Sequence, residues 1–215
     1  MNAYNNFKLK HMLSNNMLHS VRDEYTEKKL ISYGFNNVIN TSCPTTWELT
    51  EEHISDIDHS KSKDVVFTLT DYGKNYEKDT LMVNDLKDNY RNVYFWPQGL
   101  HDMSYFNKLA INGINVLAPS LPTFEKILIE ENIDYVGTRL HAGIKALQLK
   151  RRALIIGIDN RAIELSKDTG IPVLERENIH NLPDMINKLQ QLELHIPFDV
   201  INKWKNFYKE LIQSR

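Results

Sequence analysis

Arginine and histidine stand two positions apart where a helix is expected to start. Arg139 and His141 follow a short apolar strand candidate, residues 135–136, and the dipeptide Gly137-Thr138. The first turn of a helix offers unpaired N–H groups and a partial positive charge, and both favour anions. A guanidinium and an imidazole added at that point predict a binding site for a phosphate or a carboxylate.

A second set of polar residues follows the next apolar strand candidate, Ala153 to Ile158. Asp159, Asn160 and Arg161 come where another helix is expected to start. Ligands of open α/β sheets bind at the C-terminal ends of the strands. Two readings stay open for Asp159 and Asn160: they bind a sugar, or they only cap the helix.

The elements that must position these residues alternate between strands and helices. Thr138 is expected to cap a helix whose buried face carries Leu140, Ile144 and Leu147, at helical spacing. This alternation predicts parallel β–α units, and therefore an α/β fold with an open, doubly wound, Rossmann-like sheet. The strands are expected at residues 65–69, 93–96, 115–117, 135–136, 153–158 and 172–174.

Changes in composition along the chain indicate four parts. Residues 1–50 read as a short partial α/β segment, and residues 51–63 are polar, lack aromatic side chains and read as a linker. The Rossmann-like domain is expected over residues 64–178. Residues 179–215 read as C-terminal helices, with apolar spacing that suits helices at 182–194 and 198–212.

Composition excludes several classes of protein. The formal net charge of −2 and the pI near 6.4 give no electrostatic reason to expect nucleic acid as a partner. The single cysteine, Cys43, allows neither an internal disulfide nor a cysteine zinc cluster, and we expect a small buried thiol. No apolar run approaches the ~18 residues of a membrane span, and no signal peptide is expected, so the expected compartment is the cytoplasm.

Common nucleotide motifs are absent from the sequence. It contains neither the GxxxxGK[ST] phosphate loop nor the GxGxxG fingerprint. Their absence weakens a nucleotide triphosphatase or a dinucleotide oxidoreductase as an interpretation. Nothing in the sequence requires a metal or a resident cofactor.

Two segments resemble the polysaccharide pyruvyl transferase family. One is SVRDEYTEKKLISYGFNNV, residues 20–38, with an Arg-Asp pair that opens a helix ending in glycine. The other joins TRLHAGIKAL, residues 138–147, to IIGIDNRAIELSKDTGIPV, residues 155–173. The strands between them fit as well, including residues 95–98 and Asp102.

The resemblance implies two Rossmann-like domains of the GT-B type with a cleft between them. It also implies transfer of a pyruvyl group from phosphoenolpyruvate to a sugar hydroxyl of a surface polysaccharide precursor, with formation of a ketal. This chain looks like the second domain with the last elements of the first. A second copy or a partner chain is therefore expected to supply the other half of the cleft.

The resemblance also assigns roles to three residues. It implies that His141 acts as acid and base or contacts the phosphate, and that Arg139 clamps an anion. Arg22 would be a second clamp, approaching across the cleft. The residues themselves leave plainer alternatives open, since His141 can hydrogen-bond a neighbour and Arg22 can pair with Asp23 or Glu24.

Two other functions remain open. A GT-B glycosyltransferase would use the same sheet and cleft, with the diphosphate of a nucleotide sugar at Arg139. Alternatively, the chain is a non-catalytic remnant or a partner subunit.

Overall fold

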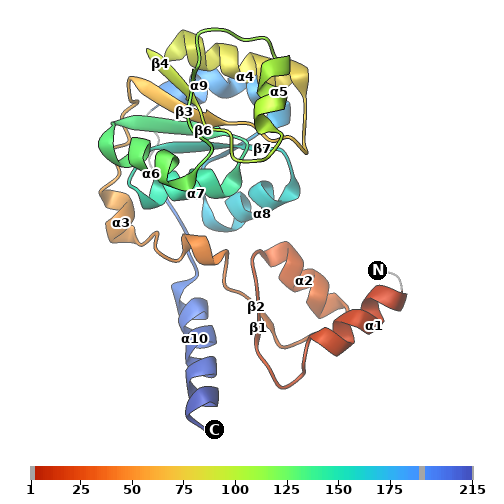
Figure 1. Cartoon of the computed structure of the whole chain (residues 1–215). Coiled ribbons are helices and arrows are strands. Elements are labelled where there is room, and N and C mark those ends of the chain that lie inside the picture. The colour runs from red at the N-terminus through yellow and green to blue at the C-terminus, as the bar shows by residue number, and fades with distance from the viewer. Residues whose placement is uncertain (1–2, 189–191, 215) are drawn as a thin grey trace.

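A six-stranded parallel sheet forms the largest part of the computed structural model, which describes residues 3–188 and 192–214 (Figure 1). The strand order is β5-β4-β3-β6-β7-β8. The strands are β3 (Asp64–Thr68), β4 (Asn92–Phe95), β5 (Asn115–Val116), β6 (Ile133–Gly137), β7 (Ala153–Gly157) and β8 (Val173–Glu175). The open parallel α/β sheet predicted from the sequence is therefore confirmed, and we call residues 64–187 the sheet domain.

Helices cover both faces of the sheet, because side chains alternate along each buried strand. Val65 and Phe67 of β3 pack into one core and Val66 packs into the other. The first core lies against α4 (Tyr76–Asn89), α5 (Asp102–Lys108) and α9 (Leu182–Asn187). The second lies against α6 (Leu121–Glu130), α7 (Leu140–Gln148) and α8 (Asn160–Thr169), as Figure 1 shows.

The chain changes direction across the sheet between β3 and β6. From β3 it proceeds outward through β4 to β5, then crosses back through α6 to β6, which pairs with the other side of β3. This is the strand order of the Rossmann fold, and its ligand crevice lies where the order reverses. The loops after β3 and β6 therefore mark the expected ligand site.

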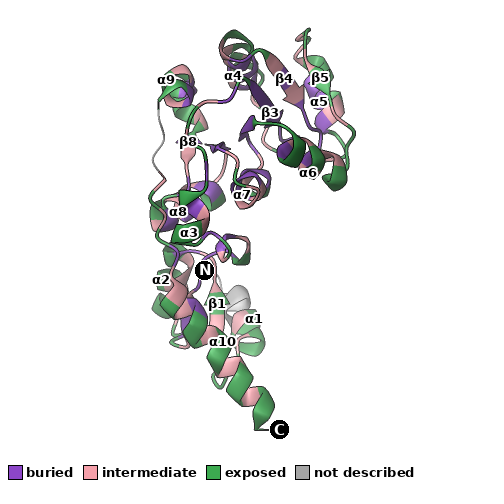
Figure 2. Cartoon of the chain, turned by 90° about the vertical axis from the view of Figure 1, so that its left-hand side faces the viewer, coloured by how far each residue is buried: buried purple, intermediate pink, exposed green. Residues whose placement is uncertain are grey.

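Residues 3–50, here called the N-terminal segment, lie below the sheet domain in Figure 1. They form α1 (Ala3–Met12), β1 (His19–Val21), α2 (Glu24–Ser32) and β2 (Val38–Asn40), with β1 parallel to β2. The helix α10 (Phe198–Gln213) returns to this segment, where Trp204 and Tyr208 both donate hydrogen bonds to the carbonyl of Leu18. Figure 2 shows that burial is concentrated in the sheet domain, while α10 is largely exposed.

Residues 51–63, expected as a linker, contain a helix. Thr50 caps α3 (Glu51–Ser55), and Ile54 and Ile57 are buried in the core. Because residues 51–63 are mostly polar, their sequence did not predict that these two isoleucines are buried. The 3₁₀ helix η1 (Pro44–Thr46) precedes α3 in the chain.

The C-terminal region also differs in detail from the expectation. The 3₁₀ helix η2 (Arg176–Asn181) leads into α9, which ends at Asn187, and part of the helix expected over 182–194 lies outside the described residues. None of the described helices is long and apolar enough to cross a membrane.

Candidate functional site

The loops after β3 and β6 meet at the switch point and fix the backbone of Arg139. The N–H of Arg139 donates to Oγ1 of Thr68, the last residue of β3, over 3.2 Å. The hydroxyl of Tyr135, a buried residue of β6, donates to the carbonyl of Arg139 over 2.9 Å. Arg139 is therefore held on rigid strands, and its side chain leaves from a defined point.

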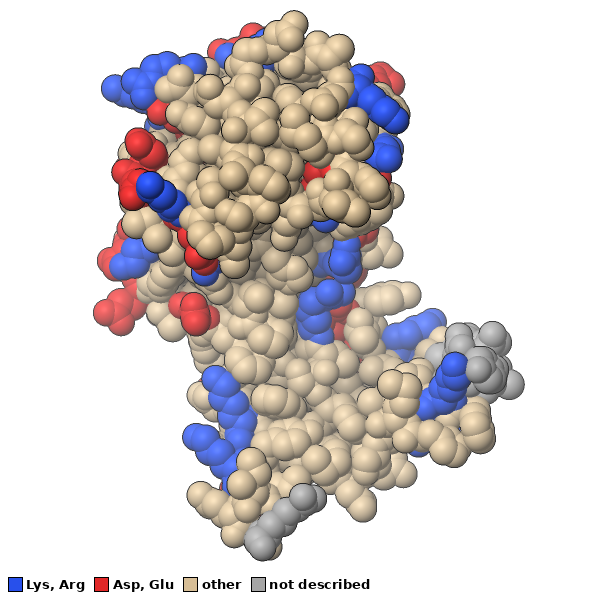
Figure 3. Space-filling model, viewed as in Figure 1, with Lys and Arg blue, Asp and Glu red and all other residues tan. Residues whose placement is uncertain are grey.

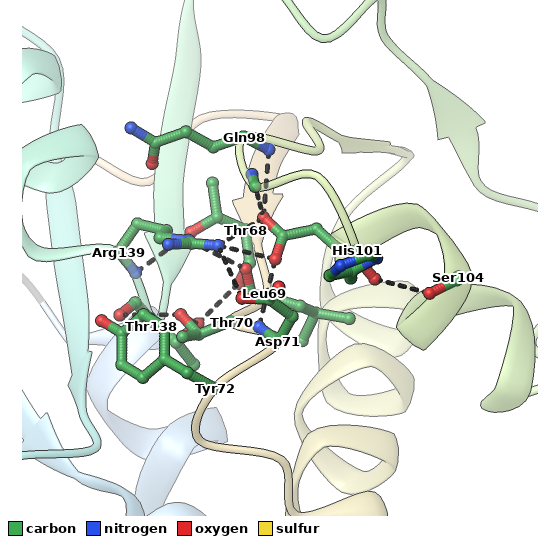
Figure 4. A network of polar contacts seen from close by, with 12 residues as sticks. Thr68, Leu69, Thr70, Asp71, Tyr72, Gln98, His101, Ser104, Thr138 and Arg139 are labelled. Carbon is green, nitrogen blue, oxygen red and sulfur yellow. Dashed lines mark hydrogen bonds and ion pairs between the residues drawn. The ribbon is translucent and has the colours of Figure 1, made fainter.

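The side chain of Arg139 pairs with a buried carboxylate (Figure 4). Its Nη2 lies 2.6 Å and 2.7 Å from the two oxygens of Asp102, and its Nε donates to the carbonyl of Leu69 over 3.2 Å. Asp71 adds a longer ion pair at 3.5 Å. These contacts use Nε and Nη2, and Nη1 makes no hydrogen bond among the residues that the structure describes.

Asp102 is the first residue of α5 and the acidic partner of this ion pair. Its side chain is fully buried and accepts hydrogen bonds from the N–H groups of Asp71, Gln98 and Gly99, at 3.1, 3.1 and 2.6 Å. Gly99 approaches so closely that an added Cβ would lie 2.5 Å from Nη2 of Arg139. The loop after β4 is thus shaped around the guanidinium.

The first turn of α7 lies beside this guanidinium without a cap. Thr138 was predicted as the N-cap, but the structure places Arg139 there, with no side-chain cap hydrogen bond. The hydroxyl of Thr138 instead lies 2.7 Å from that of Thr70, in the loop after β3. The amide of Ala142 donates to the carbonyl of Arg139 over 3.1 Å, whereas those of Leu140 and His141 make no hydrogen bond among the described residues and, with Nη1 of Arg139, can bind an anion.

A second arginine stands at the start of α8. Asp159 is the N-cap, accepts from the N–H of Arg161 over 2.9 Å, and pairs with the Arg161 guanidinium at 2.5 Å. Although burial raises the pKa of Asp159, its hydrogen bonds with Arg161 and the nearby positive charge leave that pKa below its ordinary value. Arg161 also donates to the hydroxyl of Tyr72, and the guanidiniums of Arg139 and Arg161 lie 5.4 and 5.8 Å from the Tyr72 ring centre.

These groups surround a first cavity of about 200 Å³. Its charged and polar lining comprises Tyr72, Gln98, Thr138, Arg139, His141, Asp159 and Arg161. On the face shown in Figure 3, Lys and Arg side chains gather, with acidic neighbours, beside the notch between the sheet domain and the N-terminal segment. The first cavity thus combines two arginines with two helix N-termini, a chemistry suited to a small anion.

His141 lines a second cavity as well as the first. The second cavity, about 250 Å³, is lined by Thr45, Trp96, Leu121, Phe124, Lys145 and Gln148, together with His141 and Gln98, which line both. The only charged group of this second lining among the described residues, apart from His141, is Lys145, which pairs with Glu125 at 2.8 Å. The exposed imidazole therefore stands between a cationic cavity and one with a mixed apolar and polar lining.

The sequence of residues 1–160 matches the family described as polysaccharide pyruvyl transferase. This match covers most of the chain and includes the loops after β3 and β6. The chain belongs to the polysaccharide pyruvyl transferase family. No curated protein matches this family member in a sequence comparison.

Solved structures share the fold of this family member. The UDP-GlcNAc 2-epimerase of Methanocaldococcus jannaschii, in complex with UDP-GlcNAc and UDP, has a TM-score of 0.57 at 13% identity, over 85% of this chain and 57% of that chain. The UDP-GlcNAc 2-epimerase of Neisseria meningitidis, bound to UDP-GlcNAc, has a TM-score of 0.51 at 16% identity, over 99% of this chain and 67% of that chain. At these identities the likeness shows the GT-B-like, Rossmann-type fold alone.

The structure brings together three of the five residues selected from the sequence. Arg139, His141 and Asp159 line the first cavity, whereas Arg22 and Asn160 do not. Arg22 lies in the N-terminal segment with its Nε 3.5 Å from Asp23, which is the ion pair that the sequence left open.

Sequence reasoning gave no role to Arg161, although it noted its position, and it missed Tyr72; both line the first cavity. Arg161 had a detectable signal, because it stands in the first turn of a helix that follows a buried strand. Tyr72 follows β3 in the same way, but an exposed tyrosine in a loop carries no such signal.

Proposed function

We propose that this protein transfers a pyruvyl group from phosphoenolpyruvate to a sugar, or to a polysaccharide precursor, and forms a ketal there. Membership of the family supports this class of transferase. The donor, the acceptor and the reaction belong to the proposal, as does the cytoplasm as its compartment, where phosphoenolpyruvate is produced. The chain spans 57% of the length of the first epimerase. The activity of a whole protein is therefore also part of the proposal.

The observation that carries the proposal is the position of His141 between two cavities of different chemistry. A transfer reaction needs donor and acceptor next to each other, with both in reach of a proton-transfer group. The first cavity offers Nη1 of Arg139, the Arg161 guanidinium and the uncapped start of α7 to a phosphate and a carboxylate. The second offers aromatic and amide groups, including Trp96 and Gln148, to an uncharged sugar ring.

In this proposal the imidazole of His141 protonates the methylene carbon of phosphoenolpyruvate. The C2 carbon becomes electron-poor, a sugar hydroxyl adds to it, and that hydroxyl releases its proton. Phosphate then leaves with the electrons of its C–O bond, and a second hydroxyl adds to complete the ketal and releases a second proton. One of the two released protons restores the imidazole, the other goes to phosphate, and general acid–base catalysis of this kind contributes ~10²–10⁴-fold.

Arg139 has the role of an anion clamp in this scheme. Asp102 holds one side of its guanidinium in place, so that the other side meets the ligand without loss of side-chain freedom. Arg161 would contact the second anionic group after leaving Asp159. This assigns the second clamp, which the sequence gave to Arg22, to a residue that lines the cavity.

A thermal-shift titration tests the proposal. Purified protein is titrated with phosphoenolpyruvate, inorganic phosphate and UDP-sugars, beside the variants Arg139→Ala and His141→Ala. A ligand that binds only the folded state adds about 2.7 kcal/mol at a hundredfold excess over its Kd. We expect phosphoenolpyruvate to raise the melting temperature, and the rise to disappear in Arg139→Ala.

The matched control removes an arginine elsewhere. Arg91→Ala deletes a guanidinium that pairs with Asp64 at the N-terminal end of β3, away from the first cavity. Its response to phosphoenolpyruvate should therefore equal that of the wild type. A response to UDP-sugars alone would favour the nucleotide-sugar enzyme instead. No response to any ligand would overturn the proposed donor site.

A further inference from the structure

The single cysteine of the chain lies against His141. The sulfur of Cys43 is 3.6 Å from Nε2 of His141, although 97 residues separate the two in the sequence. Cys43 is buried and comes from the loop between β2 and η1, whereas His141 belongs to the first turn of α7. The sequence offered no partner for this thiol, and the tertiary structure supplies one.

The loop that carries Cys43 is held firmly in place. The carbonyl of Cys43 accepts from the N–H and the hydroxyl of Thr46, at 2.8 and 2.7 Å. Ser42 has a φ of 61°, a left-handed conformation that is uncommon without glycine and that concentrates at functional sites. Gln148 of α7 donates to the carbonyl of Thr45 over 2.7 Å, which fixes the loop against α7.

The contact leaves one ring nitrogen of His141 uncommitted. Nε2 faces the thiol, and Nδ1 makes no hydrogen bond within the described parts of the chain. A hydrogen bond at one imidazole nitrogen determines which nitrogen carries the proton and fixes the rotation of the ring. We propose that Cys43 is a positioning residue for His141, which fixes its ring through Nε2 and leaves Nδ1 for the ligand.

Electrostatics at the pair agrees with this role. Burial raises the pKa of the Cys43 thiol, but hydrogen bonds from His141 and Thr45 outweigh that effect and lower the pKa to about 7. The charged groups that share a cavity lining with His141 are Arg139, Arg161 and Asp159 in the first cavity and Lys145 in the second. A thiol with a pKa near 7 is partly ionised at neutral pH, and its sulfur can then accept a hydrogen bond from Nε2 of His141.

The first experiment tests the pair without any substrate. Thiolate absorbance at 240 nm is followed against pH in the wild type and in His141→Gln, with Cys43→Ser as the blank for tyrosine. We expect the midpoint to rise from about 7 toward the ~8.5 of an ordinary cysteine, and a full rise lowers the thiolate fraction at pH 7 about sixteenfold. The same midpoint in both proteins would overturn the pair.

The second experiment tests the positioning role, which rests on the proposed function. The melting-temperature shift with phosphoenolpyruvate is measured from pH 6 to 8.5 in the wild type, Cys43→Ala and Cys43→Ser. We expect Cys43→Ala to weaken the shift and change its pH dependence, and Cys43→Ser, which retains a hydrogen-bonding group, to restore part of it. Identical pH profiles in all three would overturn the positioning role.

The two experiments separate the two proposals. A thiol titration that responds to His141→Gln, with no effect of phosphoenolpyruvate in any protein, would uphold the pair and overturn the proposed donor. An unchanged thiol titration with a normal response to phosphoenolpyruvate would overturn the pair and uphold the proposed donor.

Discussion

Two arginine–aspartate pairs stand at opposite ends of strand β6. Asp134, near the start of the strand, pairs with Arg152 at 3.2 Å, and Arg139, just after its end, pairs with Asp102 at 2.6 Å. Both pairs are shielded from water and join neighbouring elements of the sheet domain. They nevertheless differ in whether the guanidinium keeps a nitrogen without a protein partner.

All three guanidinium nitrogens of Arg152 contact protein groups. Its guanidinium also donates to the carbonyls of Ile186 and Lys188, and its partner Asp134 accepts from the hydroxyl of Tyr90 over 2.7 Å. Arg152 has a side-chain exposure of 5%, against 16% for Arg139. Arg139 keeps Nη1 without a partner among the described residues and faces the first cavity.

The comparison shows that two similar ion pairs can differ in whether the arginine keeps a nitrogen available to a ligand. A buried pair satisfied on every side connects elements, and removing one partner leaves an uncompensated charge. A pair satisfied on only one side holds its arginine ready for a ligand. The N-terminal ends of the strands therefore carry the structural pair, and the C-terminal ends carry the open pair.

The largest expected effect comes from breaking the closed pair. Arg152→Ala should lower the free energy of unfolding by about 3–5 kcal/mol, because Asp134 is left buried without its cation. Arg139→Ala should cost less, about 1–3 kcal/mol, because three backbone N–H groups still satisfy Asp102. Urea denaturation of both variants measures the difference, and equal losses would remove the distinction between the pairs.

The next effect concerns the loop around the open pair. Gly99→Ala places a Cβ 2.5 Å from Nη2 of Arg139 and 2.9 Å from Oδ1 of Asp102, so the pair must shift. We expect the affinity for phosphoenolpyruvate to fall by about 1.5–3 kcal/mol, with the fold retained. Calorimetric titration measures this loss, and Leu100→Ala, an exposed neighbour, is the matched control. Unchanged affinity in Gly99→Ala would show that the position of the guanidinium is not important.

A smaller effect extends the comparison to the exposed pair of Arg161 and Asp159. Asp159→Asn keeps a good N-cap but weakens the hold on Arg161. Because exposed pairs contribute ~0.5 kcal/mol, we expect affinity for phosphoenolpyruvate to rise about twofold to threefold. The same calorimetric titration would reveal a loss of affinity if Asp159 instead bound the substrate.

The smallest effect is a dependence of stability on pH. The folded-state pKa of Asp159 lies below its ordinary value, so its contribution to stability is present above that ordinary value and is lost as the pH falls through the lowered pKa. Urea midpoints measured from pH 6 to 3 should show a slightly shallower decline in Asp159→Asn than in the wild type. A steeper decline in the variant would contradict the assigned direction.

Much of the fold could be predicted from local patterns. The spacing of Ile144 and Leu147 identified α7, and apolar runs identified the strands of the sheet domain. Local reasoning failed at Thr138 because its hydroxyl pairs with Thr70, a partner 68 residues away. It also missed the buried isoleucines Ile54, in α3, and Ile57, just after it, because two apolar residues in a short polar stretch are too few to form a pattern.

The candidate site, like the fold, could be predicted from the sequence only in part. The sequence by itself determined that Arg139 and His141 stand at the start of a helix after a buried strand, where anions bind. Only the tertiary structure decided that Asp102 holds the arginine, that Arg161 rather than Arg22 reaches the cavity, and that Cys43 meets the histidine. The physical reason is that helix periodicity and capping act over a few residues, whereas each of these contacts joins separate elements and exists only once the core has packed.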